Sequence, residues 1–184
     1  MKMIRLNIII ILASLLYITA SVLFCNLFFN KNSNGSLIRI NKEIIGSQHI
    51  GQEFINDKYF HGRVSLNHYN NYYSGNSNLA YTSRELKEIT TNNYLKFKEL
   101  NKNTNSIDLN LISESASGLD PHITLNAAII QIPRVSNFGK IEERKLLDLV
   151  EKSARPLAFG LFGEKLINVL EVNLKLRELY GTKN

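Results

Sequence analysis

One uncharged apolar segment near the N-terminus, Ile8 to Phe29, limits what this chain can fold into more than any other feature. As an α-helix it would be roughly 33 Å long, which is enough to cross the hydrocarbon core of a bilayer. Each Ile, Leu, Val or Phe in it favours insertion by roughly 0.3–0.6 kcal/mol. Ser14, Thr19 and Ser21 can return hydroxyl hydrogen bonds to carbonyls of the same helix, so they oppose insertion little. The sequence therefore predicts a membrane anchor.

Two other interpretations of this segment remain open. Lys2 and Arg5 precede it and small residues occur at 19–21, which is the pattern of a cleaved signal peptide. The apolar run continues through Phe24, whereas signal h-regions usually span about 7–15 residues, and this favours an uncleaved anchor. Cys25 could instead carry the lipid of a lipoprotein, but the residue before such a cysteine is normally small.

Charge indicates the orientation of the anchor. Lys2, Arg5 and the terminal amine precede it, whereas Lys31 is the only charged residue after it before Arg39. This bias places the N-terminus in the cytoplasm, and a following portion of about 155 residues translocates largely regardless of its own charge. We therefore expect a single-pass protein of the cell membrane, with the C-terminal domain outside the cytoplasm.

Composition divides the chain into an anchor, residues 1–30, and one domain, residues 31–184. A domain of that length can bury a stable core without disulfides or structural metal ions. The only cysteine is Cys25 in the anchor, so the domain has neither a disulfide nor a thiol nucleophile. The net charge of +6 is spread among acidic residues without a block of five like charges, which is typical of a solvated surface and does not favour a nucleic-acid partner.

Hydrophobic periodicity predicts an α+β fold for the domain. We expect strands at Ser36–Ile40, Glu43–Ser47 and Ile107–Ile112, with a turn at Asn41–Lys42. We expect helices at 83–100, from Asp120 to just before Pro133, at 141–154 and at 165–180, with a glycine-marked turn at 159–163. The aromatic and Asn-rich segment Phe54–Thr82 has no sustained period, and we expect it to be a long ordered loop pinned by its aromatic side chains.

The densest polar cluster runs from Ser113 to Thr124 and combines hydroxyl, carboxylate and imidazole groups. One hypothesis is a membrane-anchored exported hydrolase that uses Ser117, Asp120 and His122. In the structural alternative, Asp120 caps a helix and His122 lies exposed in its first turn. The spacing of Asp120 and His122 does not put them on one helix face, so we expect no metal site. Elsewhere, Arg63 and Arg134 are expected to pair with carboxylates, either on a partner or within the domain, and the sequence favours structural pairing within the domain.

Several motifs occur in a distinctive order along the chain. They are Gly35-Ser36-Leu37-Ile38, Gly46-Ser47, Ile50-Gly51-Gln52-Glu53-Phe54, Tyr59-Phe60-His61-Gly62-Arg63-Val64-Ser65, Ser74-Gly75-Asn76-Ser77-Asn78-Leu79, Ser117-Gly118-Leu119-Asp120-Pro121-His122-Ile123, Gln131, Arg134-Val135, Leu161-Phe162-Gly163-Glu164 and Asn168-Val169-Leu170 followed by Asn173. This order resembles the C subunit (KdpC) of the Kdp-type, high-affinity, ATP-driven potassium pump of bacteria. The resemblance covers nearly the whole chain. The chain departs from the family's pattern at Val64, where Pro is usual, at Asn76 and Ala116, where Gly is usual, and at Ser153–Leu157.

The resemblance implies a non-catalytic accessory subunit of a potassium uptake complex. In this family one subunit forms a channel-like potassium pore, and a separate P-type subunit hydrolyses ATP. The C subunit is described as a catalytic chaperone that raises the ATP affinity of the hydrolysing subunit. The implied partners are these two subunits and membrane lipid, with ATP reached through the complex and Gln52 a candidate nucleotide-binding residue. The candidate partner-contact residues are Arg63, Asn78, Ser117, Asp120, His122, Arg134 and Asn173.

The expected topology conflicts with direct contact to ATP, because a domain outside the membrane does not meet cytoplasmic nucleotide. We therefore expect the domain to cap the outer mouth of the pore subunit and to influence the pump at a distance. A basic cap above a potassium entrance is electrostatically unfavourable unless the face toward the pore is acidic or neutral.

Overall fold

The computed structural model describes residues 2–102, 104, 106–156 and 160–181. Contacts divide the chain into two compact units, the first ending at Ser47 and the second beginning at Gln48. The boundary lies after a β-hairpin that groups with the N-terminal helix.

The N-terminal unit begins with α1, Lys2–Phe28, which has no buried residue and contains an 18-residue window with a mean hydropathy of 2.6. Among the described residues it is the only helix long and apolar enough to span a membrane. The hydroxyls of Ser14, Thr19 and Ser21 donate to carbonyls of the preceding turn at 2.8–3.0 Å, as the sequence predicted. These polar groups are thereby satisfied within the helix, which is what a lipid environment requires.

A short helix, α2 at Asn30–Ser33, leads to an antiparallel hairpin of β1, Leu37–Ile40, and β2, Glu43–Ser47. Asn41 and Lys42 form the predicted turn, and both have positive φ angles of 50° and 71°. Two such residues give the turn whose twist matches that of the strands it joins. The pairing shifts by one residue, because Ile38 pairs with Gly46 whereas Arg39 pairs with Ile44. β2 therefore carries a β-bulge at Ile45, next to Gly46.

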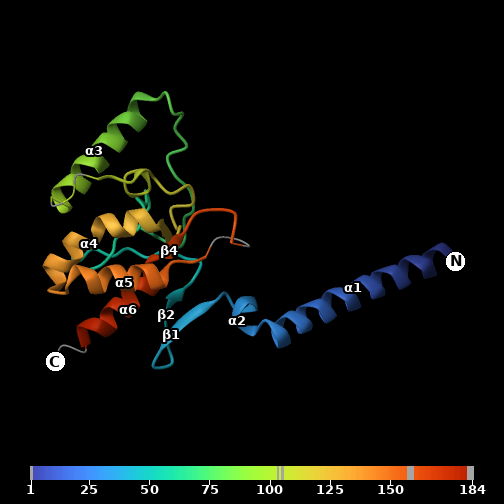
Figure 1. The fold of residues 1–184 in the computed structure, drawn as a ribbon. Coiled ribbons are helices and arrows are strands. Elements are labelled where there is room, and N and C mark those ends of the chain that lie inside the picture. The colour runs from blue at the N-terminus through green and yellow to red at the C-terminus, as the bar shows by residue number, and fades with distance from the viewer. Residues whose placement is uncertain (1, 103, 105, 157–159, 182–184) are drawn as a thin grey trace. The chain divides into compact units, whose positions relative to one another are not determined.

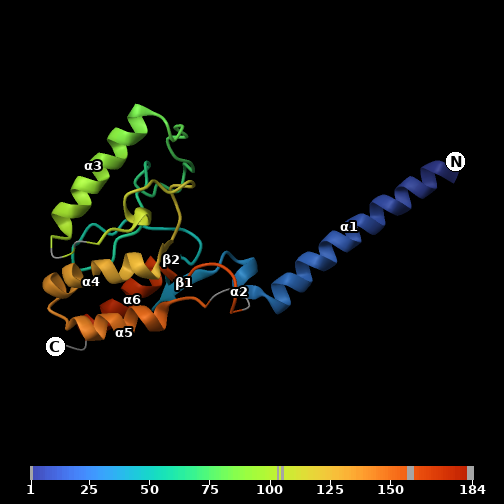
Figure 2. The same cartoon turned by 45° about the horizontal axis from the view of Figure 1, so that its top comes forward.

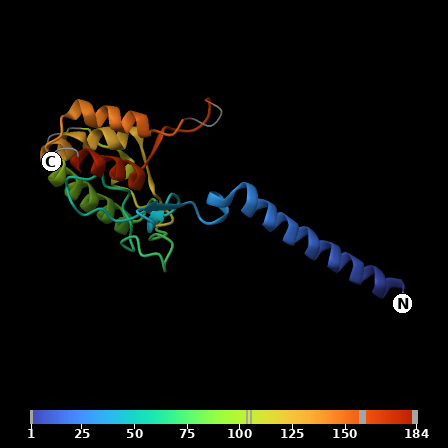
Figure 3. The same ribbon diagram turned by 90° about the horizontal axis from the view of Figure 1, so that it is seen from below.

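The C-terminal unit contains two strands that each lead directly into a helix. β3, His122–Thr124, pairs antiparallel with β4, Leu166–Asn168. β3 is followed by α4, Leu125–Gly139, and β4 is followed by α6, Val169–Gly181. Figures 1, 2 and 3 show α4 and α6 grouped with α5, Glu143–Ser153, which contacts both of them. The mixture of short strands and helices confirms the α+β class.

The core lies among these elements and is almost wholly aliphatic. α5 contributes Leu146 and Val150. The helical period of this segment predicts Leu146, Leu149, Val150 and Ala154 as its buried stripe, and Leu149 and Ala154 are half-buried. Among the described residues, Phe60 and Phe97 are the aromatic ones buried in the core, and Phe60 enters it from a loop rather than from a helix or strand. The fully buried hydrophobic residues are Phe60, Ile123, Ala127, Ala128, Val135, Leu146, Val150, Ile167, Val172 and Leu176.

The start and the end predicted for the helix after Asp120 were both wrong. Residues 122–124 form β3, and Thr124 caps α4 by accepting a hydrogen bond from the Ala127 amide at 2.9 Å. The Asp120 carboxylate is engaged elsewhere, by Arg63 and by the backbone of His122. α4 also continues through Pro133 to Gly139. The buried residues on both sides of Pro133 show that core packing outweighs the local cost of proline.

Two other predictions fail, one because of local hydrogen bonds and one because of pairing with a distant strand. The strand expected at Ile107–Ile112 is a 3₁₀ turn, η1 at Leu109–Leu111. The Asp108 carboxylate accepts from the Asn110 amide at 2.9 Å and from the Thr124 hydroxyl at 2.7 Å, which bends the chain. The helix expected from residue 165 begins only after β4, because residues 166–168 pair with β3.

The segment from Gln48 to Ser83 contains no helix or strand, although Val64 forms an isolated bridge with Glu114. This agrees with the long ordered loop predicted for Phe54–Thr82. It leads into α3, Arg84–Leu100, whose start after Ser83 was also predicted. Phe97 is the one buried side chain of α3, so this helix is joined to the core mainly at its C-terminal end.

Two adjacent leucines of α5 test the core. Leu146 is fully buried, whereas Leu147 is 36% exposed. We expect Leu146→Ala to lower the free energy of unfolding by about 2–5 kcal/mol, because it leaves a cavity among aliphatic neighbours. Leu147→Ala is the matched control and should cost less than about 1 kcal/mol. Urea unfolding of the detergent-solubilised chain, followed by circular dichroism, measures both, and equal losses would contradict this packing.

Candidate functional site

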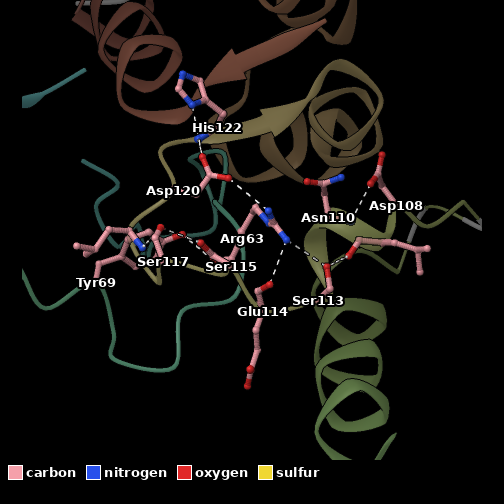
Figure 4. Close-up of polar contacts among 12 residues, drawn as sticks. Arg63, Tyr69, Asp108, Asn110, Ser113, Glu114, Ser115, Ser117, Asp120 and His122 are labelled. Atoms are coloured by element: carbon pink, nitrogen blue, oxygen red, sulfur yellow. Dashed lines mark hydrogen bonds and ion pairs between the residues drawn. The ribbon is translucent and has the colours of Figure 1, made fainter. Parts of the chain in front are cut away.

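The predicted polar cluster is organised by Arg63, which reaches it from the long loop (Figure 4). One guanidinium nitrogen, Nη1, lies 3.3 Å from Oδ2 of Asp120. The other, Nη2, donates to the carbonyl of Glu114 at 3.1 Å and to the hydroxyl of Ser113 at 3.5 Å. Arg63 therefore pairs with a carboxylate inside the domain, which was one of the roles expected for it.

Asp120 connects Arg63 to His122. Its Oδ1 accepts a hydrogen bond from the His122 amide at 3.0 Å and lies 3.4 Å from the ring nitrogen Nδ1 of His122. Burial by itself would raise the pKa of Asp120, but the hydrogen bonds from His122 and Arg63 outweigh burial and hold this pKa below its usual value. The carboxylate is thus kept ionised by groups on both sides of it.

Two nitrogens in this cluster are buried without a hydrogen-bond partner among the described residues. They are Nε of Arg63 and Nε2 of His122. A shallow depression next to them is lined by the turn from Ser115 to His122 together with His49 and Ile50. The two nitrogens give this part of the domain hydrogen-bonding capacity that its own side chains do not use.

Ser117 does not join this chain of contacts. Its hydroxyl accepts from the Leu119 amide at 3.1 Å and lies 3.4 Å from the hydroxyl of Ser115. Within the described residues, no hydrogen bond joins Ser117 to His122. The geometry therefore gives no support to the hydrolase hypothesis, since a nucleophile needs a base within hydrogen-bond reach.

The turn around Gly118 instead fastens the long loop. The Ser117 carbonyl accepts from the Gly75 amide at 2.8 Å, and the Gly118 carbonyl accepts from the Ser65 hydroxyl at 2.7 Å. Gly118 has a φ of 69°, and a Cβ on it would lie 2.9 Å from the Gly75 carbonyl oxygen. Glycine is required here both by backbone conformation and by the close approach of the loop.

Tyr69 is a second fastening point, and sequence reasoning missed it. Its hydroxyl donates to the Arg63 carbonyl at 2.6 Å, and its amide donates to the Ser65 hydroxyl at 2.9 Å. Its ring occupies the space that a Cβ on Gly51 or Gly62 would need. Burial, followed by the nearby Asp120, raises the pKa of Tyr69. The two glycines were the available signal, since they mark a close approach of backbone to a ring.

Arg134 is buried and binds amide and carbonyl oxygens instead of the carboxylate that the sequence led us to expect. Its Nε donates to the Asn101 side chain at 3.0 Å, and its Nη2 donates to the Gln131 side chain at 2.6 Å. Its Nη1 donates to the carbonyls of Asp57 and Tyr59. Burial lowers the pKa of Arg134 to about 10. Burial, followed by the charge of Arg134, also lowers the pKa of His61 to about 4, so His61 is neutral at physiological pH.

The other candidate residues lie in three different environments. Asn173 is buried, and its side-chain amide exchanges two hydrogen bonds with the backbone of Phe60, at 2.9 Å and 2.8 Å. Asn78 is exposed and has a φ of 52°. Gln52 is half-buried and is not among the residues lining the cleft of about 420 Å³ between the long loop and α3. The structure therefore joins Arg63, Asp120 and His122 but leaves the remaining candidates apart from them.

The departures from the expected motif fit the local backbone. Val64 accepts a hydrogen bond at its carbonyl from the Ser115 amide at 2.8 Å. Neither Asn76 nor Ala116 has a positive φ, so neither position needs glycine. In the segment Ser153–Leu157, the Ser153 hydroxyl accepts from Lys175 at 3.0 Å, and Leu157 lies outside the described residues.

Within residues 2–102, 104, 106–156 and 160–181, no group of three His, Cys, Asp or Glu side chains could hold a metal ion. The polar side chains described above bind one another and the loop backbone. Together with α1, they define a class of protein: a membrane-anchored α+β domain whose polar cluster fastens a long loop to the turn around Gly118.

Comparison with known proteins identifies the family. The family model "KdpC: K+-transporting ATPase, c chain" matches residues 1–178. The potassium-transporting ATPase KdpC subunit of Bacillus cytotoxicus is 36% identical over 174 residues, covering 94% of this chain and 91% of that protein. The KdpC subunit of Bacillus cereus strain B4264 is 40% identical over 151 residues, covering 80% and 78%. The chain belongs to the KdpC family, and as such it is an accessory subunit of a potassium-transporting ATPase complex.

Asp120→Asn tests the polar cluster. We expect this variant to lose about 1–3 kcal/mol of unfolding free energy at pH 7, because Arg63 and His122 lose a charged partner. A folded-state pKa below the ordinary 3.8 gives stability that is complete above that value and is lost as the pH falls through the folded-state pKa. The difference between wild type and variant should therefore shrink between pH 7 and pH 3 in urea unfolding experiments.

Asp148→Asn is the matched control for that experiment. Asp148 pairs with Lys152 at 2.7 Å on the exposed surface of α5, where such a pair contributes little. A loss at Asp120 that is the same at both pH values, or no larger than the loss at Asp148, would contradict the role assigned to Asp120.

Proposed function

We propose that the chain is a single-pass subunit of a high-affinity, ATP-driven potassium uptake complex, in which it supports assembly by docking on the potassium-translocating subunit. The observation that carries this proposal is the family match over residues 1–178, which includes the anchor. Residues 1–30 are the anchor, and residues 31–184 are the domain outside the cytoplasm.

Three features support a docking role. α1 has no buried residue, so its apolar surface is free for lipid or for the membrane helices of a partner. The polar candidates Arg63, Asp120 and His122 are joined to one another and leave two buried nitrogens with unused capacity. Ser117 lacks the contact with His122 that turnover would require.

We propose that the chain changes the ATP affinity of the hydrolysing subunit indirectly, through the complex. A domain outside the membrane raises the ATP affinity of the hydrolysing subunit by stabilising one conformation of the pore subunit to which it is docked. Gln52 contacts nucleotide only if the domain lies in the cytoplasm. The topology of the domain therefore decides between the indirect and the direct route.

Deletion of the chain tests the assembly role. We expect the deletion strain to lose growth at micromolar potassium and to regain it when the chain is supplied from a plasmid. A tagged copy should copurify with the two large subunits from detergent-solubilised membranes. Full growth of the deletion strain at micromolar potassium, or purification of the tagged chain alone, would contradict the proposal.

A cysteine introduced by Asn92→Cys tests the topology. Asn92 is exposed on α3, and the Cys25→Ser background removes the only native thiol. We expect a membrane-impermeant maleimide to label this cysteine in intact spheroplasts or cells. An Asn7→Cys variant in the same background is the control and should react only after lysis. Labelling of the Asn92 position only after lysis would place the domain in the cytoplasm and would make Gln52 a direct candidate for nucleotide contact.

A further inference from the structure

Outside the anchor, one long stretch of the chain carries no fixed charge. Between Arg63 and Arg84 the sequence contains no Lys, Arg, Asp or Glu, although the whole chain carries a net charge of +6. Asn, Ser, Gly and Tyr make up most of this stretch. We call residues 66–82 the tyrosine loop.

The tyrosine loop presents aromatic side chains to solvent. Tyr72 is 92% exposed, Tyr73 is 65% exposed and Tyr81 is 92% exposed. Tyrosine gives a large, rigid contact area with a polar end, and Ser, Gly and Asn provide adaptable hydrogen bonding. This is the composition of surfaces that bind proteins through neutral contacts, as antibody loops do.

The loop is ordered in spite of its length, because it is tied to the turn beside the Arg63 cluster. The Gly75 amide and the Ser74 hydroxyl donate to the Ser117 carbonyl at 2.8 Å and 3.1 Å. The Ser77 amide donates to the Glu114 carboxylate at 3.1 Å. A loop that is already ordered loses less conformational freedom on binding a partner.

The backbone of the loop adopts disfavoured conformations at three residues. His68, Tyr69 and Asn78 have φ angles of 50°, 55° and 52°, which residues other than glycine rarely adopt. Such conformations persist only where the surroundings impose them, and they concentrate at binding sites. At Tyr69 the surroundings are Gly51, Gly62 and the Arg63 carbonyl.

We propose that the tyrosine loop is the surface by which this domain docks on the potassium-translocating subunit of its complex. The inference rests on the function proposed above and names the face that performs it. A basic domain held above a potassium entrance repels the ion if its charged surface faces the pore. The tyrosine loop adds no fixed charge, so it can lie against a cation pathway without opposing the ion.

The partner surface that fits is uncharged and rich in hydrogen-bonding groups. It receives the rings of Tyr72 and Tyr81 in shallow apolar pockets and pairs with the amides of the asparagines between them. The contact therefore depends on aromatic area and on hydrogen bonds, and only weakly on salt.

Site-specific photocrosslinking in the intact membrane complex tests the surface. A benzoylphenylalanine replaces Tyr72 or Tyr81 in one set of chains and replaces Phe138, which is 54% exposed on α4, in the matched control. We expect crosslinks from Tyr72 and Tyr81 to the potassium-translocating subunit, and none from Phe138. Crosslinks only from Phe138, crosslinks to the hydrolysing subunit, lipid or a second copy, or none from an intact complex would overturn the proposal.

Substitution provides a second readout that separates the inference from the proposed function. We expect Tyr72→Arg to raise the potassium concentration for half-maximal uptake at least about tenfold, because it removes an anchor ring and adds a cation. Tyr72→Phe should stay close to wild type, and Asn137→Arg, which adds the same charge at an exposed position of α4, should change it less than about twofold.

The outcomes distinguish the two hypotheses. If the wild-type chain does not copurify with the large subunits, the proposed function fails and the inference fails with it. If the complex copurifies intact but Tyr72→Arg takes up potassium like the wild type, the inference alone is overturned.

Discussion

The domain depends on how a chain segment without helix or strand satisfies its backbone polar groups. Buried backbone N–H and C=O groups need partners, and residues 57–61 have no neighbouring strand to provide them. Side chains from α4 and α6 take that place. Gln131 pairs with both backbone groups of His61, and Asn173 pairs with both backbone groups of Phe60. Arg134 binds the carbonyls of Asp57 and Tyr59, and Tyr180 donates to that of Lys58 at 2.6 Å.

This arrangement gives two of the candidate site residues, Arg134 and Asn173, a structural role inside the domain. Arg134 and Asn173 were expected to contact a partner, and both are buried and hold the loop in place. The same fixed loop carries Phe60 into the core and Arg63 to the turn that contains Asp120. Between Arg63 and Arg84 the chain contains no Lys, Arg, Asp or Glu, and this stretch includes the tyrosine loop. The buried amides thus position, at a distance, the surface that we propose binds the partner.

Much of the candidate site was open to prediction from sequence, and the reason differs from residue to residue. The pairing of Arg63 with an internal carboxylate follows from the general rule that buried charges are paired. The hydrogen bonds between the Gln131 side chain and the backbone of His61, which replace those of a neighbouring strand, do not follow from the sequence. They join two segments 70 residues apart in the chain. Tyr69 could be inferred only by asking what lies against Gly51 and Gly62, and the sequence alone does not name the ring.

The sequence by itself determined the features that depend on local chemistry. These are the apolar helix, the hairpin turn at Asn41–Lys42, the start of α3 after Ser83, the buried stripe of α5 and the absence of any cysteine outside the anchor. Only the tertiary structure decided that α4 begins at Leu125 and continues through Pro133, that residues 166–168 form a strand, and that Asp120 faces Arg63. Each of these depends on a contact with a distant segment, and the free energy of such a contact exceeds the small local preferences that a sequence pattern records.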